Sequence, residues 1–179
     1  MSPSPGVVVR EATAADLPTI QRIYAHHVLH GLASFEEAPP DVAEMRRRFD
    51  DIQARGLPFV VAGLDGGVQG YAYAGPYRQR SAYRYAVEDS VYVAPDAVGR
   101  GLGRAALTEV IRRADAAGFR QMIAVIGDSA NLPSIRLHES LGFRHAGTLR
   151  GVGFKLGRWV DSVFMQTSLG QGDGLPPAG

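Results

Sequence analysis

The sequence contains no cysteine, which excludes a disulfide framework, a thiol nucleophile and a thiolate metal site. The formal net charge is +1, whereas general nucleic-acid-binding proteins usually carry a strong basic excess. No apolar run approaches the roughly 20 residues that cross a bilayer. The opening MSPSPG has neither the basic nor the apolar region of a signal peptide. We therefore expect a cytoplasmic protein with no nucleic-acid or membrane partner.

The composition is that of a globular protein. The chain has 179 residues, 45% of them hydrophobic and 21% charged, which is sufficient for a core without disulfides or metal. We expect one domain over residues 6–169. The two ends, residues 1–5 and 170–179, consist largely of glycine, proline and small polar residues, and we expect them to be flexible tails.

Hydrophobic periodicity and turn signals predict the order strand, two helices, three strands, helix, strand, helix, two strands. In the first predicted helix, residues 13–29, Thr13 is the expected N-cap, and five apolar side chains share one face: Leu17, Ile20, Ile23, Tyr24 and Val28. The other predicted helices cover 41–56, the run that ends near 118, and 131–143. The predicted strands cover 6–10, the hairpin at 58–77, and 83–95, 121–127, 144–154 and 159–168. This order indicates one mixed sheet with helices on both faces.

A glycine-rich loop lies between a predicted strand and a predicted helix. It contains Gly99, Gly101 and Gly103, interleaved with Arg100 and Arg104. The first amides of a helix have no intrahelical partners and lie at the positive end of its dipole, so such a loop favours phosphate. A tight turn packed by glycines is the alternative. A Rossmann fingerprint and a Walker loop are excluded by the spacing and by the missing Gly-Lys-Ser/Thr.

Two motifs in the right order resemble the GCN5-related N-acetyltransferase (GNAT) family. VGRGLG resembles the family's R/Q-x-x-G-x-G/A pyrophosphate loop, and VYVAP precedes it. NLPSIRLHESLGF matches the segment N-x-x-A-x-x-x-Y-E-x-x-G-F, with these residues in register: Asn131, Ser134, His138, Glu139, Gly142 and Phe143. The resemblance runs from Val8 to about Leu169 and implies the α/β GNAT acyl-CoA N-acyltransferase fold, a mixed, mostly antiparallel central sheet with helices on both faces.

Shorter stretches are similar to one branch of that family, the phosphinothricin and methionine sulfoximine acetyltransferases. They are YAGPYRQRSAY, VEDSVYV, AVIG, LHESLGF and GFKLGRWVD. This branch implies an enzyme that acetylates the α-amine of a small amino acid or analogue. It also implies a histidine at position 138, where most of the wider family carries tyrosine.

The resemblance implies acetyl-CoA as co-substrate, with no metal. The residues that it places against acetyl-CoA are Val91, Tyr92, Val93, Val98, Gly99, Arg100, Gly101, Leu102, Gly103, Arg104 and Asn131. Val98 stands where the family usually carries Arg or Gln, so Arg100, Arg104 or the backbone amides are left to bind the phosphates. Asn131 can also cap the helix that it opens. The amide of Val93 is the expected donor to the oxyanion.

Two adjacent carboxylates, Glu88 and Asp89, are candidates for the general base. Successive side chains of a strand point to opposite faces, so we expect at most one of them to face a given cleft unless a bulge intervenes. The residues alone do not choose between them, and the resemblance favours Glu88. An exposed carboxylate paired with a nearby arginine is the alternative for Glu88, and Asp89 is expected to matter little.

His138 is the second candidate catalytic residue. As the replacement of the family's tyrosine, it can protonate the departing thiolate or take part in the base's proton transfer. A packed, neutral histidine is the alternative. The remaining histidines show no metal-ligand pattern and are expected to be surface or packing residues: His26, His27, His30 and His145.

Four residues are candidates for substrate binding: Phe35, Arg78, Arg80 and Tyr83. Arginine presents a planar fork suited to a carboxylate or phosphinate, although arginine clusters are often only solvated edges. Phe35 is expected to form an apolar wall, with core packing as its alternative. The resemblance places Lys155 and Trp159 near the site or a dimer contact, and implies a homodimer.

Two alternative functions stay open at this point. One is acetyl transfer to another amine, such as a protein N-terminus or a polyamine. The other is a non-catalytic module that binds acetyl-CoA. A binding module predicts a degenerate base, whereas Glu88, Asn131 and His138 are all present.

Overall fold

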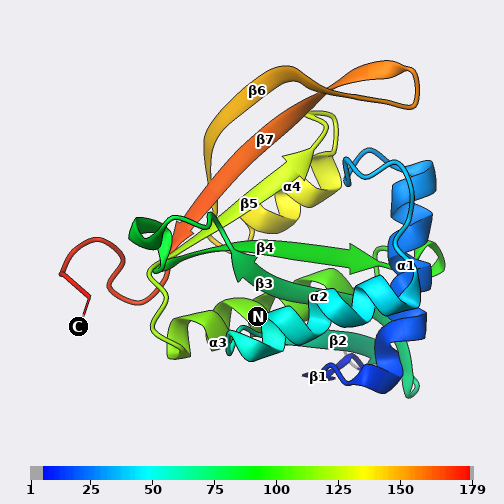
Figure 1. The fold of residues 1–179 in the computed structure, drawn as a ribbon, viewed down its shortest axis with the longest axis horizontal. Helices are drawn as coiled ribbons and strands as arrows, with labels where there is room; N and C mark the ends of the chain where they lie inside the picture. Colours follow the sequence, from blue (N-terminus) through cyan, green and yellow to red (C-terminus); the bar gives the residue numbers. More distant parts are fainter. Residues whose placement is uncertain (1–5, 178–179) are drawn as a thin grey trace.

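The computed structural model describes residues 6–177 (Figure 1). Its strands are β1 (Val8–Glu11), β2 (Phe59–Leu64), β3 (Gly67–Pro76), β4 (Ala86–Val93), β5 (Gln121–Gly127), β6 (Arg144–Lys155) and β7 (Arg158–Ser168). Its α-helices are α1 (Leu17–His30), α2 (Val42–Ala54), α3 (Leu102–Ala116) and α4 (Leu132–Glu139). The predicted order of strands and helices is confirmed.

All seven strands form one sheet in the order β1-β2-β3-β4-β5-β7-β6. Every neighbouring pair is antiparallel except β4 and β5, which run parallel. The sheet is therefore mixed and mostly antiparallel, as predicted. A parallel pair needs a crossover connection, and α3 supplies it between β4 and β5.

Helices cover both faces of the sheet. On one face, Tyr24 of α1 packs edge-on against Tyr92 of β4, with the ring centroids 5.0 Å apart. On the other face, Gly103 of α3 lies against Val91 and Val93 of β4, and Leu137 of α4 packs at the same place. Residues of β4 with even numbers thus face α1, and those with odd numbers face α3 and α4.

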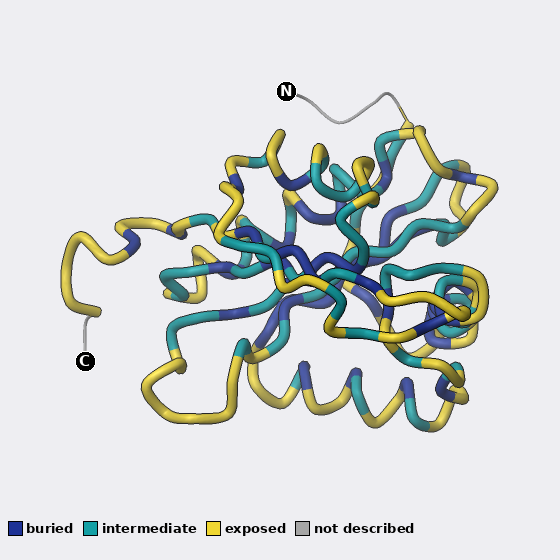
Figure 2. Tube along the Cα trace, turned by 90° about the horizontal axis from the view of Figure 1, so that it is seen from above, coloured by how far each residue is buried: buried dark blue, intermediate teal, exposed yellow. Residues whose placement is uncertain are grey.

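The core lies between these layers. Buried residues concentrate in the central strands and on the inward sides of the helices (Figure 2). The five apolar residues predicted on one face of α1 are all buried: Leu17, Ile20, Ile23, Tyr24 and Val28. The other side of that helix is mostly polar, although Leu29 is 48% exposed, so the 3.6-residue periodicity correctly identified the packed face.

The start of the first helix differs from the prediction. Thr13 precedes a short 3₁₀ turn, Ala14–Asp16, and α1 begins only at Leu17. The Asp16 carboxylate accepts hydrogen bonds from the Thr13 amide and hydroxyl, and it forms an ion pair with Arg10. These bonds hold the tight turn, and Arg10 is the main cause that lowers the pKa of Asp16 to about 2.

The structure describes only part of the two predicted tails. Residues 1–5 and 178–179 lie outside the described residues. In the described part of the C-terminal segment, the Arg120 guanidinium donates to the carbonyl oxygens of Gly172 and Pro176 at 3.4 Å. Between residues 6 and 177, no helix is both long and apolar enough to cross a membrane.

Candidate active site

The sheet opens between β4 and β5. The two strands pair over four positions, from Ala86 with Gln121 to Asp89 with Ala124. Beyond Asp89, β4 continues to Val93 while pairing with β3 alone. The gap therefore begins at the point where the parallel ladder stops.

The backbone of β4 directs alternate amides into this gap. The Ala94 amide donates to Gln69 O and the Tyr77 amide to Ala86 O, so the even-numbered residues of β4 make the hydrogen bonds to β3. The amides of Val91 and Val93 consequently point toward β5, which does not pair with them. Val93 O accepts a hydrogen bond from His27 Nε2 of α1 at 2.8 Å.

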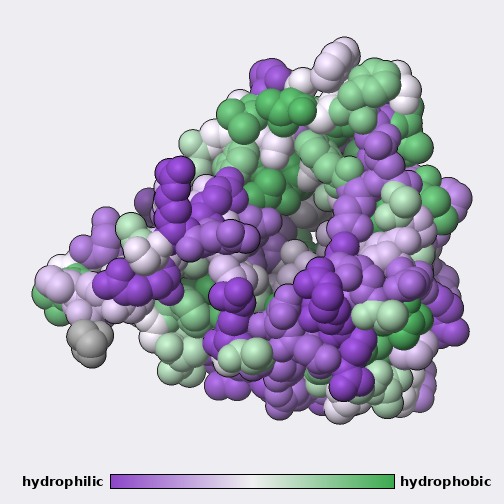
Figure 3. Space-filling view, viewed as in Figure 1, coloured by the Kyte–Doolittle hydropathy of each residue, from purple (hydrophilic) through white to green (hydrophobic). Residues whose placement is uncertain are grey.

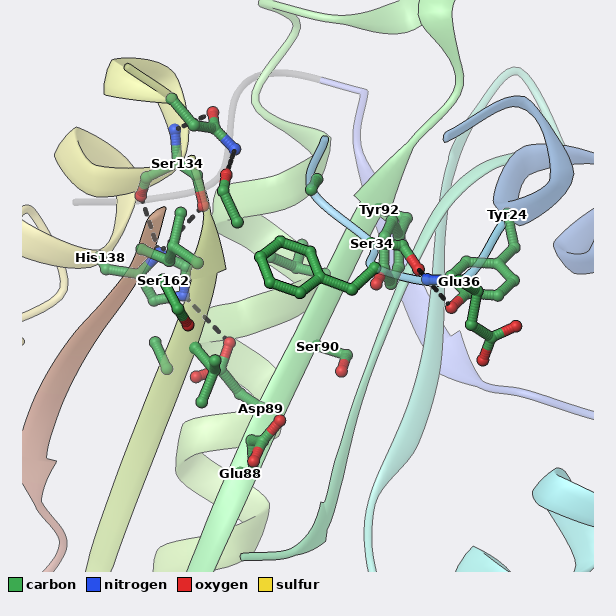
Figure 4. Close-up of a pocket in the computed structure, with 18 of the residues that line it drawn as sticks. Tyr24, Ser34, Glu36, Glu88, Asp89, Ser90, Tyr92, Ser134, His138 and Ser162 are labelled. Carbon is green, nitrogen blue, oxygen red and sulfur yellow. Dashed lines mark hydrogen bonds and ion pairs between the residues drawn. The ribbon is translucent and has the colours of Figure 1, made fainter. Parts of the chain in front are cut away.

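A cavity of about 440 Å³ occupies the gap (Figure 4). Its wall combines β4 and β5 with the segment after α1, which includes Ser34, Phe35 and Glu36, and with α4, which contributes Ser134 and His138. Both adjacent carboxylates line it, because the cavity passes between the strands and meets both faces of β4. The expectation that one carboxylate alone would face the cleft was therefore wrong.

Glu88 reaches the cavity from the α1 face. Its side chain is 34% exposed, and its Oε2 lies 3.9 Å from Arg78 Nη1. Burial raises the pKa of the Glu88 carboxyl above its ordinary value, while the positive charge of Arg78 opposes that shift. A raised pKa makes this carboxylate a stronger base than a fully exposed one.

Asp89 reaches the cavity from the other face and pairs with His138. The Asp89 Oδ2 atom lies 3.0 Å from His138 Nε2, and both side chains are almost fully buried. His138 Nδ1 lies 2.7 Å from Ser134 O. Sequence reasoning named Asp89 as the alternative to Glu88 but missed its pairing with His138, because no local signal links two residues 49 positions apart.

The glycine loop has the predicted form. Gly99 and Gly101 adopt left-handed backbone conformations, with φ of 82° and 84°, and Gly101 is the N-cap of α3. The first amides of α3 follow directly, so the loop presents unpaired N–H groups. Within residues 6–177, Arg100 and Arg104 make no ion pair.

The other residues predicted to bind the cofactor differ in their burial and contacts. Gly103 is packed, since a Cβ there would lie 3.4 Å from Val93. Val98 is 64% exposed, and Leu102 is buried. The Tyr92 ring stacks on Tyr71 and its backbone pairs with β3, so Tyr92 lines the cavity without offering a free amide to a ligand. Asn131 both lines the cavity and caps α4 by accepting from the Ser134 amide.

The predicted substrate residues are divided between two hollows. Phe35 lines the cavity at β4 and β5, whereas Arg80 and Tyr83 line a second hollow of about 710 Å³ beside α2. Arg78 also lines the second hollow and links the two through its approach to Glu88. The structure thus brings Phe35, Glu88, Asp89 and His138 together and leaves Arg80 and Tyr83 apart.

The segment that carries Phe35 is held from several sides. Lys155 Nζ, although 4% exposed, donates to Ser34 O at 2.6 Å. The Tyr24 hydroxyl bonds Ser34 Oγ at 2.8 Å, and Arg48 pairs with Glu36 at 2.7 Å. Lys155 therefore shapes this wall of the cavity.

Two glycines allow this segment to lie where it does. A Cβ on Gly127 would lie 2.1 Å from Leu32 O, and a Cβ on Gly153 would lie 2.5 Å from the Phe35 ring. Side chains at these two positions would collide with the segment. The glycines thus let it cross the end of β5 and let Phe35 pack on β6.

The remaining histidines do not form a metal centre. Over residues 6–177, no three His, Asp or Glu side chains gather in an arrangement that holds a metal ion. His26 lies near His27 and His30, at centroid distances of 5.6 and 4.9 Å. Burial lowers the pKa of His27, which suits a neutral ring whose Nε2 donates to Val93 O.

Comparisons with known proteins agree with these features. The acetyltransferase (GNAT) domain profile matches residues 9–164. Phosphinothricin N-acetyltransferase of Alcaligenes faecalis is 54% identical over 169 residues, which cover 94% of this chain and 86% of the relative. L-methionine sulfoximine/L-methionine sulfone acetyltransferase of Pseudomonas aeruginosa is 43% identical over 162 residues, 90% of this chain and 94% of the relative.

A solved structure is similar over nearly the whole chain. It is a GNAT superfamily phosphinothricin acetyltransferase from Sinorhizobium meliloti in complex with acetyl-CoA. The TM-score is 0.94 at 50% sequence identity, covering 97% of this chain and 94% of the other.

Proposed function

The chain belongs to the GNAT family of N-acetyltransferases, and we propose that it acetylates the α-amine of a small amino acid or analogue, of the phosphinothricin or methionine sulfoximine type. Acetyl-CoA is the acetyl donor. The observation that carries this proposal is the cavity between β4 and β5, which has a half-buried carboxylate, Glu88, on one side and unpaired amides of β4 along its wall. The relatives named above supply the substrate class.

The geometry suits acetyl-CoA in two places. The amides at the start of α3 and the left-handed glycines Gly99 and Gly101 form an anion site for the pyrophosphate. The amides of Val91 and Val93 point into the gap, where an extended arm with amide groups can pair with them. Arg100 and Arg104 supply the positive charge that Val98 lacks.

Glu88 acts as the general base in this proposal. It removes the proton from the substrate ammonium, and the free amine then attacks the thioester carbonyl. The pKa of Glu88 is raised toward neutral pH, which strengthens it as a base. The amide of Val93 donates to the oxygen that becomes negative, an interaction that contributes about 3–4 kcal/mol in comparable sites.

His138 donates a proton to the departing thiolate. It lines the same cavity as Glu88 but belongs to the opposite face of the sheet. The proposed acid and base therefore stand on opposite faces of β4, and His138 must release its contact with Asp89 or Ser134 to donate a proton.

Arg78 is the basic side chain that we assign to the substrate's carboxylate, because it lines the second hollow and approaches Glu88, which lines the cavity. Phe35, 43% exposed at the cavity, supplies an apolar wall for the substrate side chain. Arg80 and Tyr83 line the second hollow and remain predicted contacts for an acidic group at the far end of the substrate.

The proposed assembly is a homodimer formed through the arm of β6 and β7. β6 is an edge strand, and large apolar side chains on the arm are more than half exposed: Leu149, Val152, Phe154, Leu156 and Trp159. Apolar side chains gather over this arm in the upper part of Figure 3. An exposed apolar patch beside an unpaired edge favours self-association. We propose that the enzyme acts in the cytoplasm.

A thiol-release assay tests the function. Purified protein is given acetyl-CoA with phosphinothricin, methionine sulfoximine, methionine sulfone, ordinary amino acids, a peptide with a free N-terminus, and spermidine. We expect thiol release with the first three and none with spermidine. Release with the peptide or spermidine alone contradicts the substrate class, and acetyl-CoA binding without any turnover supports a non-catalytic module.

A further inference from the structure

The ring of Phe35 limits the cavity on the side of the segment that follows α1. The Phe35 side chain is partly exposed and lines the same cavity as Glu88, the proposed base. An amino acid must place its amine at Glu88 to react, so the room left for its side chain depends on where this ring lies. A shift of the ring would therefore change which side chains fit.

The backbone on both sides of Phe35 is held by polar contacts. Ser34 Oγ bonds the Tyr24 hydroxyl at 2.8 Å and accepts a hydrogen bond from the Glu36 amide at 3.2 Å. Arg48 of α2 pairs with the Glu36 carboxylate at 2.7 Å. Two further contacts come from β6, one to the backbone before Phe35 and one to its ring.

The backbone contact comes from Lys155, the last residue of β6. Its side chain is buried, and its Nζ donates to Ser34 O at 2.6 Å. A charged donor makes a stronger hydrogen bond to a carbonyl than a neutral donor does. Burial lowers the pKa of Lys155, while the nearby carboxylates of Glu37 and Glu36 favour its charged form. Lys155 thus fixes the peptide group that leads into Phe35.

The ring contact is with Gly153, two residues earlier on β6. A Cβ on Gly153 would lie 2.5 Å from Phe35 Cε2 and within 3.0 Å of two other ring atoms. Carbon atoms in contact normally lie about 3.5–4.0 Å apart, so the ring occupies the place that a side chain at this position would take. Val152 and Phe154 are exposed on the opposite side of the strand. The glycine therefore allows the Phe35 ring to lie against β6.

We propose that β6 sets the size of the substrate side chain: Gly153 and Lys155 are positioning residues that hold Phe35 against the arm and keep the cavity open to side chains as long as that of methionine sulfoximine. The inference rests on the proposed function and adds the residues that make its substrate choice. Both residues act through Phe35. A side chain at position 153 would press the ring away from β6 toward the cavity, which would then admit only shorter amino acids.

Steady-state kinetics of Gly153→Ala test the ring contact. Gly153 does not have a positive φ, so alanine can adopt its backbone conformation. We expect kcat/KM for methionine sulfoximine to fall by roughly 10- to 200-fold, the discrimination that one methylene gives in an apolar pocket. The KM of acetyl-CoA should stay the same.

Gly147→Ala is the matched control on the same strand. Gly147 also lacks a positive φ, and a Cβ there would meet no atom within 4 Å among the residues that the structure describes. This variant adds the same methyl group to β6 away from Phe35. It should keep the kinetics of the wild-type protein.

A double-mutant cycle shows whether Gly153 acts through Phe35. Phe35→Ala removes the ring, so the addition of Gly153→Ala should change kcat/KM no further. Lys155→Met keeps a side chain of similar length but loses the bond to Ser34 O. It should raise the KM of the amino acid and leave the KM of acetyl-CoA unchanged.

Three results overturn the inference. Gly153→Ala with the kinetics of Gly147→Ala removes the ring contact from substrate choice, and it does so even if Lys155→Met does not fold. An effect of Gly153→Ala that persists without the Phe35 ring, or equal rises of both KM values in Lys155→Met, reduces these residues to a structural role. A wild-type protein that acetylates nothing overturns the proposed function and this inference with it, whereas an active wild-type protein with either earlier result overturns the role of β6 alone.

Discussion

At the scale of single residues, the two carboxylates of β4 are separated by the pleat of the strand. Glu88 faces α1 and Arg78, whereas Asp89 faces α4 and His138. Each carboxylate therefore has its own partner. The strand alternation was predicted from the sequence, but the cavity that passes between β4 and β5 makes both faces available to one ligand.

Glu88→Gln keeps the shape of the side chain and removes its basicity. We expect kcat to fall by roughly 10²–10⁴, the usual range for a general base, while the affinity for acetyl-CoA stays the same. Because the pKa of Glu88 is raised, wild-type kcat should decline as the pH falls through the pKa of Glu88. This decline on the acidic side of the pH profile should disappear in the variant. Steady-state kinetics across pH measure both effects.

A matched control for this variant is Glu11→Gln on the edge strand β1, where the side chain is 63% exposed. It should retain full activity. The loss in Glu88→Gln should also shrink at high pH, because more of the substrate amine is already neutral. Equal activity of the two variants would place the base elsewhere.

The pairing of Asp89 with His138 could not be predicted from residue patterns in the sequence. Each residue lies in a motif, and the motifs correctly predicted a strand and a helix. Their contact depends on how α4 packs against β4, which no periodicity within either segment encodes. The same holds for Arg80 and Tyr83, since the path of the segment between β3 and β4 assigns them to the second hollow.

At the scale of elements, the loop before α3 joins a strand end to a helix start through left-handed glycines. This was predictable because glycine is the residue that adopts such conformations freely. The 3₁₀ turn before α1 was not predicted, because the Asp16 carboxylate is drawn into bonds with Thr13 and Arg10. Local capping signals indicated that a helix begins here but not which helix type comes first.

Gly101→Asp should weaken acetyl-CoA binding at least about tenfold, which corresponds to about 1.4 kcal/mol. The added carboxylate would stand at the N-terminus of α3, where the pyrophosphate is proposed to bind. Isothermal titration calorimetry on the folded variant measures the change.

Gly66→Asp provides the matched control, since Gly66 has φ of 81° against 84° for Gly101 and lies in the turn between β2 and β3. It carries the same backbone strain and the same added charge but should bind acetyl-CoA normally. Equal affinities in both variants would remove the loop from the binding site.

At the scale of the whole molecule, the arm of β6 and β7 carries five large apolar side chains that are more than half exposed. Trp159 is 69% exposed and contacts Phe154 at a centroid distance of 5.2 Å. Trp159→Asp should convert a dimer into a monomer, because it places a charge in an apolar interface. Analytical ultracentrifugation compares it with Val8→Asp, which alters a similarly exposed side chain, 64%, on β1 at the other edge of the sheet. A wild-type protein that sediments as a monomer contradicts the dimer.

The short ladder between β4 and β5 also affects the stability of the fold. Backbone pairing between these strands joins the β1–β4 half of the sheet to the β5–β7 half at four positions. A ligand bound in the gap would contact both the β1–β4 half and the β5–β7 half, so its binding would stabilise their association. By mass action, a ligand at 100 times its Kd adds about 2.7 kcal/mol to the free energy of unfolding. We therefore expect acetyl-CoA, bound in the proposed position, to link the two halves of the sheet and to raise the resistance of the protein to heat and proteolysis as its concentration rises.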